Sequence, residues 1–153
     1  MSQAVVHAFQ QALAGELEAL EKQILELVEP LDEEQFYRKP IEPGNSVGHL
    51  VLHLTGNLNH FVGARLGQTG YVRDRQREFT DPAPPPKAVA LAQLAEAVAL
   101  YRRVLESLSN ERLLQAPVDA HLGPTIAAAM VRLVSHFALH RGQISYLVRL
   151  VRT

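Results

Sequence analysis

The chain has 153 residues, with 15 Lys and Arg against 16 Asp and Glu, and its formal net charge is −1. Binding to nucleic acid depends largely on basic residues that displace counterions, so a nearly neutral chain argues against a nucleic-acid partner. The sequence contains no cysteine, which excludes disulfides, thiolate metal ligands and a cysteine nucleophile. Any metal ion must therefore be held by histidine or carboxylate, and any thiol chemistry needs a thiol cosubstrate.

The length fits a single domain, covering residues 1–153. No apolar run approaches the roughly 20 residues that cross a bilayer. The first residues, MSQAVVHAFQQALAGELEAL, lack the cationic start, apolar block and cleavage site of a signal peptide. We therefore expect a soluble, cytoplasmic protein that does not contact membranes.

The first part of the chain has the periodicity of a helix. Apolar residues recur every three or four positions from Val5 to Leu27, which predicts one amphipathic helix ending at Pro30. The following DEEQFY, residues 32–37, fits one short turn of helix before the next prolines.

Three later segments share this periodicity, and the predicted helices cover about residues 47–66, 88–108 and 124–151. The first of the three begins after PGNS, where Asn45 or Ser46 suits the N-cap. The last begins at Pro124, because proline is favoured at the first helical position. No alternation of period two is present, so the sequence predicts an all-α fold without strands.

The joint between the second and third long helices, residues 67–87, is far longer than the usual connection between antiparallel neighbours. A helix of about 20 residues is about 30 Å long, and an extended segment of this size can run that whole length. The third helix then returns parallel to the second, with PAPPP holding the end of the segment extended. We predict a four-helix bundle with one long crossover between helices 2 and 3.

Five of the seven histidines form two clusters, His49, His53 and His60 on the second predicted helix and His136 and His140 on the fourth. At about 100° per residue, each cluster shares one helix face. Side chains at i and i+4 can bind one ion together, and an imidazole from a facing helix completes a three-histidine set. Such a set leaves a position open, where a bound water is acidified to a pKa of about 7.

The histidines can also be ordinary packed or exposed residues, because an H-x-x-x-H pair is weakly specific by itself. Buried imidazoles need hydrogen-bond partners, however, and these apolar helices offer few. A ferritin-like di-iron centre is excluded because no Glu-x-x-His pairs occupy core faces. HExxH, G-x-S-x-G and phosphate-binding loops are absent as well.

Two glycines accompany the histidines, Gly56 on the histidine side of the second helix and Gly142 just after His140. Each lowers helix stability by about 1 kcal/mol relative to alanine. Either two helices approach closely at these positions, or the glycines leave room for a ligand beside the metal.

The blocks GNSVGHLVLHLTGN, RDRQREF and HFALHRGQISYLVRL resemble, in this order and spacing, the DinB-like superfamily of metalloenzymes, most closely a branch without assigned activity. The resemblance covers most of the chain, and H-x-x-x-H-R-G-Q-I is its most specific part. It implies a four-helix bundle with a long crossover, a homodimer, and a metal ion held by His53, His136 and His140. His49 and His60 match no usual ligand position, and we expect them to be packed or exposed rather than to support or replace a ligand.

Relatives of this fold include thiol-dependent transferases and an isomerase that use mycothiol, bacillithiol or glutathione, and proteins described as metal-dependent hydrolases. The fold alone does not choose among these activities. The first hypothesis is an enzyme in which a divalent ion, Zn or Ni first and Fe or Co as alternatives, activates a low-molecular-weight thiol or water. The nucleophile then attacks a small electrophilic molecule.

Polar residues near the histidines have predicted roles in this hypothesis. Asn57 and Gln143 are best placed to orient a ligand or a ligating imidazole. Arg73, Asp74 and Arg75 on the crossover either reach an anionic substrate group or form a solvated loop that pairs with itself.

Two other hypotheses remain. In one, the protein is a non-catalytic metal-binding or stress-related bundle, with His49 or His60 closing the coordination shell. In the other, the histidines bind no metal and only pack. The number of protein ligands separates the first two, because a catalytic site keeps an open position and a structural site does not.

Overall fold

The computed structural model describes residues 2–153, which form helices and connecting segments without any strand. This confirms the all-α prediction. The long helical segments are α1 (Gln3–Val28), α3 (Val47–Leu58) with its extension η1 (Asn59–Ala64), α5 (Lys87–Ser107) and α7 (Ile126–Val151). Shorter helices lie in the connections: α2 (Glu33–Tyr37), α4 (Arg77–Thr80), α6 (Asn110–Leu114) and η2 (Ala120–Leu122). Within the described residues, every helix is too short or too polar to span a bilayer.

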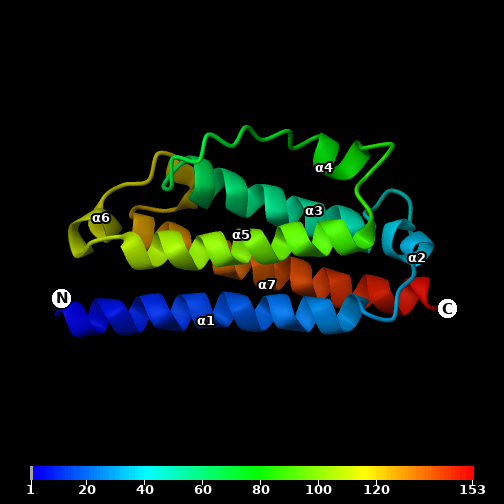
Figure 1. The fold of residues 1–153 in the computed structure, drawn as a ribbon, viewed down its shortest axis with the longest axis horizontal. Helices are drawn as coiled ribbons and strands as arrows, with labels where there is room; N and C mark the ends of the chain where they lie inside the picture. The colour runs from blue at the N-terminus through cyan, green and yellow to red at the C-terminus, as the bar shows by residue number, and fades with distance from the viewer. Residues whose placement is uncertain (1) are drawn as a thin grey trace.

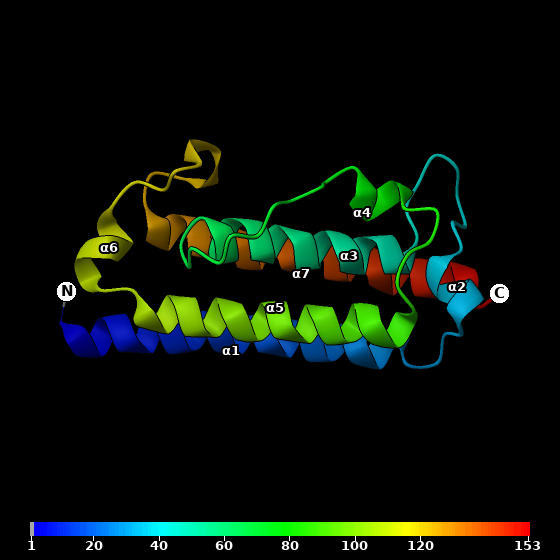
Figure 2. The same cartoon turned by 45° about the horizontal axis from the view of Figure 1, so that its top comes forward.

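The long helices lie side by side, with α1 and α7 running in one direction and α3 and α5 in the other (Figure 1). Each of α1 and α3 packs against both α5 and α7. The segment between η1 and α5 runs back along α3 and carries α4 on its way (Figures 1 and 2). This return path is the reason that α5 is parallel to α3, as the length of the crossover predicted.

The long helices α3 and α7 begin at side-chain caps. The Ser46 hydroxyl accepts a hydrogen bond from the His49 backbone N–H at 3.0 Å, which confirms Ser46 as one of the two predicted N-caps of α3. The prediction that Pro124 opens the last helix is wrong. Thr125 is the N-cap of α7, because its hydroxyl accepts from the Ala128 N–H at 3.1 Å, and Pro124 lies before the cap.

The sequence predicted one continuous α-helix over about residues 47–66. The structure differs, because only the first part of this segment is α-helical. Beyond Leu58 the chain winds as the π-helix η1, in which the Arg65 N–H donates to the His60 carbonyl at 3.1 Å. Each residue of a π-helix turns through a smaller angle than in an α-helix, so the count of about 100° per residue fails here. His60 lies in η1, whereas His49 and His53 both lie in α3, so only the angular position of His60 departs from that count.

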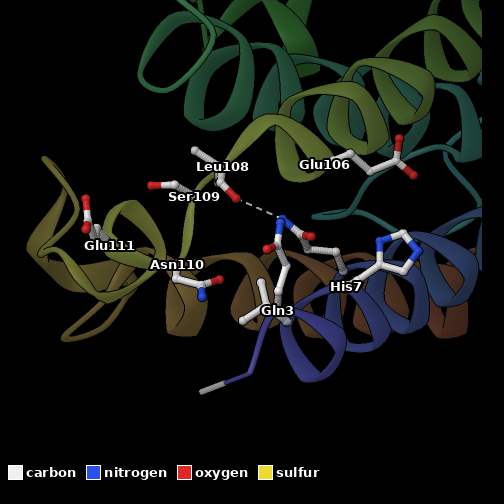
Figure 3. Close-up of a pocket in the computed structure, with 9 residues that line it drawn as sticks. Gln3, His7, Glu106, Leu108, Ser109, Asn110 and Glu111 are labelled. Carbon is white, nitrogen blue, oxygen red and sulfur yellow. Dashed lines mark hydrogen bonds between the residues drawn. The ribbon is translucent and has the colours of Figure 1, made fainter.

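Buried polar groups join the helices inside the apolar core. The Tyr101 hydroxyl of α5 donates to the Met130 carbonyl of α7 at 3.0 Å. The Gln10 side chain donates to the carbonyls of Leu105 and Leu108 at 2.7 and 3.0 Å, and so satisfies the end of α5. Figure 3 shows the bond at Leu108, in a polar cavity between the start of α1 and the α5–α6 connection.

Replacing Tyr101 by phenylalanine should lower the free energy of unfolding by about 1 kcal/mol, because the Met130 carbonyl loses its buried donor. Urea denaturation measures this as a lower midpoint with an unchanged slope. Tyr146→Phe is the matched control, since this α7 side chain is 62% exposed. Equal midpoints for the two variants would show that the Tyr101 bond contributes nothing to stability.

Candidate metal centre

Three imidazoles converge between α3 and α7. The Nε2 atom of His136 lies 3.2 Å from Nε2 of His53 and 3.0 Å from Nε2 of His140. One ring nitrogen from each residue lies within 4.8 Å of the others. Two nitrogens bound tetrahedrally to one zinc ion at about 2.0–2.1 Å are about 3.3 Å apart. The separations of His136 from His53 and from His140 are thus close to those of ligands that share one ion.

Hydrogen bonds fix the tautomers of two of these rings. His53 donates from Nδ1 to Oε2 of Glu78 at 2.9 Å, and His140 donates from Nδ1 to Oε1 of Gln143 at 2.7 Å. A carboxylate and an amide oxygen can only accept, so both protons lie on Nδ1. The two Nε2 atoms are left with lone pairs directed into the cluster, as in metal-binding imidazoles.

His136 lies between these two lone pairs. A proton on its Nε2 can satisfy only one of the two facing nitrogens, whereas one cation satisfies all three. Its Nδ1 is buried and has no hydrogen-bond partner within residues 2–153. The donor set therefore suits a metal ion better than it suits hydrogen bonds among the imidazoles.

Burial keeps the α7 pair neutral. Desolvation, reinforced by the positive charges of neighbouring histidines and arginines, lowers the pKa of His136 to about 4. Desolvation also lowers the pKa of His140, while its hydrogen bond to Gln143 acts in the opposite direction. Both lowered pKa values favour the neutral imidazole, which is the state that binds a metal ion.

Glu78 of α4 is the residue of this site that sequence analysis missed. Its side chain is 7% exposed and accepts hydrogen bonds from His53 and from Arg73, at 2.6 Å from Nε and 2.9 Å from Nη2. Burial by itself raises the pKa of this carboxyl, but the bonds from His53 and Arg73 and the Arg73 charge outweigh burial and lower it. The carboxylate remains ionised and holds the His53 ring in place.

Gly56 makes this arrangement possible. A Cβ atom at this position would lie 2.1 Å from Oε1 of Glu78, so only glycine leaves room for the carboxylate. The expected close approach at Gly56 is therefore to a side chain of the short helix α4. A Cβ atom at Gly142 would meet no other described atom within 4 Å, so close packing does not explain that glycine. Gly56 was the feature of the sequence that could have indicated a buried side chain packed against this point of α3.

The remaining predicted residues take different positions. Asn57 is buried and lines a cavity beside the three histidines. His49 is buried away from them, with Nδ1 2.8 Å from the Ser46 hydroxyl, and His60 packs its ring edge-on against Phe61. Neither joins the metal-type cluster found among the described residues, in line with the expectation that they are packed residues.

The three charged residues of the crossover each have a different partner. Arg73 is only 10% exposed and pairs with Glu78, so it is neither free in solvent nor available to a substrate by itself. Asp74 accepts from the Arg77 backbone N–H at 3.1 Å. Arg75 places its guanidinium over the Phe79 ring, 5.7 Å from the centroid. The loop does pair with itself, but its main ion pair is buried and supports the site.

The histidines border a cavity of about 580 Å³. Its volume is in the range of small-molecule sites. Its walls include Phe61 from η1 and Phe79 from α4, together with leucines from η2 and α7. The cluster therefore has space for a ligand beside it, in a cavity that Glu78 does not line.

These features define an all-helical protein with a three-histidine group able to hold a metal ion. The sequence model of the DinB superfamily matches residues 16–144, and the chain belongs to this superfamily. This confirms the resemblance found in the three sequence blocks.

Comparison with solved structures supports the same fold. A conserved protein from Enterococcus faecalis superposes with a TM-score of 0.76 at 19% sequence identity, over 92% of this chain and 95% of that one. At this identity the similarity shows the fold alone. No curated protein matches the chain.

Gly56→Ala and Gly142→Ala should change stability in opposite directions. Alanine at position 142 has open space around its methyl group and should raise the free energy of unfolding by up to about 1 kcal/mol. Alanine at position 56 displaces the Glu78 carboxylate from buried charged partners, and bonds to such groups contribute about 1.5–3 kcal/mol each, so stability should fall. Urea denaturation of both variants measures the difference. If both variants were stabilised equally, Glu78 would be able to move away from position 56 without lowering the free energy of unfolding.

Proposed function

We propose that the four long helices form a single-domain bundle of the DinB type in which His53, His136 and His140 hold one divalent metal ion. The protein would use this ion to activate a low-molecular-weight thiol or water for attack on a small electrophilic molecule. The observation that carries the proposal is that three Nε2 atoms converge beside a cavity. The Nδ1 atoms of His53 and His140 point away from this cluster and donate hydrogen bonds to Glu78 and Gln143.

A divalent ion held by three neutral imidazoles would supply a Lewis acid that lowers the pKa of a water or thiol. The chain supplies the rest. Glu78 and Gln143 hold the protons on Nδ1 of His53 and His140, which keeps both rings oriented. The buried Asn57 offers an amide to a ligand in the cavity, and Phe61 and Phe79 reduce its exposure to water.

The alternative of a closed, structural metal site needs a fourth protein ligand. His49 and His60 were the residues expected to provide it, and both are engaged elsewhere. The donor set of three imidazoles favours Zn or Ni and is compatible with Fe or Co. Geometry therefore favours an open site over a filled tetrahedral shell.

Protein prepared without an affinity tag should contain, or take up, one equivalent of zinc or nickel. His53→Ala and His140→Ala should each lose the metal, because two imidazoles bind it far more weakly than three. His60→Ala removes a histidine outside the cluster and should retain it. Elemental analysis after dialysis measures all four proteins. A wild-type chain that binds neither metal would refute the proposal.

The open position can be tested with cobalt, whose visible spectrum reports its ligands. Addition of 2-mercaptoethanol to the cobalt-loaded protein should change this spectrum, because the thiol enters a position that no side chain fills. The same titration of His60→Ala is the control and should give the same change. A spectrum that does not respond to thiol or to pH would indicate a closed shell, and the non-catalytic function would then replace the enzyme.

A further inference from the structure

Among the described residues, the charged side chains that line the cavity beside the histidines are all of one sign. Three arginines line it, Arg73 and Arg75 from the crossover and Arg132 from α7, and no aspartate or glutamate does. Arg132 lies one helical turn before His136, on the side of α7 that carries the cluster. Two different segments of the chain thus bring cations to the same space.

Only one of these cations is neutralised. Arg73 shares the buried carboxylate of Glu78, which lies behind His53. Arg75 and Arg132 form no ion pair with any carboxylate of residues 2–153. Unpaired arginines are common on surfaces. Here, however, the two converge on one cavity, and a divalent ion on neutral imidazoles would add further positive charge.

Nearby acids are occupied elsewhere. Asp119, close to η2, binds Arg65 at 3.2 Å, and Asp74 accepts from the backbone of Arg77. Neither lines the cavity. Among the described residues, the lining of this cavity therefore contains no carboxylate.

The walls between the cations are apolar and aromatic. The Phe79 ring lies 5.0 Å from the His53 ring, centroid to centroid, and Arg75 lies over its face. Arg73 lies over the Phe61 ring at 5.9 Å, and His121 packs edge-on against that ring at 5.6 Å. Because each ring supports a guanidinium, the apolar walls and the cationic groups are parts of one surface.

We propose that this cavity binds a small organic anion, a carboxylate with an apolar body, and that Arg75 and Arg132 recognise its charged group. A guanidinium fork bonds a carboxylate through two parallel N–H donors, and the aromatic walls take the body of the ligand. The inference rests on the proposed function in taking this cavity as the substrate site, and it names the substrate class. The reacting end of the ligand then lies toward the histidines.

Binding of phenylacetate and of its neutral analogue phenylacetamide tests this, measured by calorimetry on metal-free and zinc-loaded protein. The metal-free protein is essential, because a carboxylate also binds zinc directly. Phenylacetate should bind at least about tenfold more tightly than the amide in both forms. Arg75→Gln and Arg132→Gln should each remove most of this preference. Arg103→Gln, an exposed α5 residue outside the cavity, removes the same charge and should leave the preference intact.

Equal affinities for the acid and the amide, no binding of the acid, or an equal loss in Arg103→Gln would overturn the inference. Its failure is distinguishable from failure of the metal site. A chain that binds no metal but prefers phenylacetate through Arg75 and Arg132 keeps the anion site and loses the proposed activity. A chain that binds metal through the histidines but does not discriminate between the two ligands keeps the metal site and loses the anion site.

Discussion

The buried hydrogen bond between Glu78 and His53 is the interaction on which the site depends. It attaches the crossover to α3, fixes the His53 tautomer and determines which ring nitrogen faces α7. A buried carboxylate is strongly unfavourable unless it is paired, and Arg73 supplies the pairing charge while Gly56 supplies the space. One ring of the metal-type cluster is thus held in place by a residue of the crossover helix α4 that bonds only the outer nitrogen of His53.

The long crossover therefore has a role beyond connection. It returns along α3 so that α5 can run parallel to α3, and it places α4 against the helix that carries His53. The same segment contributes Arg73, Arg75 and Phe79 to the cavity walls. A short turn between α3 and α5 would remove the support of the histidine and one side of the cavity together.

The two faces of the histidine cluster differ in charge. The carboxylate of Glu78 does not line the cavity, and its charge is paired with Arg73 at the cavity edge, whereas Arg75 and Arg132 line the cavity without an acidic partner in the described residues. Glu78 can therefore orient the His53 ring without adding negative charge to the lining of the cavity in which a substrate would bind. The proposed metal site and the proposed anion-binding cavity would therefore be compatible parts of one arrangement.

Local patterns in the sequence determined the all-α fold and the approximate bounds of α1 and α5. They also determined the Ser46 cap and the i, i+4 pair of His136 and His140. Each of these features depends on neighbours within one or two helical turns. The crossover length also predicted the parallel return. Only tertiary structure decided the partner of His53, which histidine of the second predicted helix joins the cluster, and what Gly56 faces. Glu78 is 25 positions from His53, and a contact at that distance depends on how the crossover packs rather than on any period in the chain.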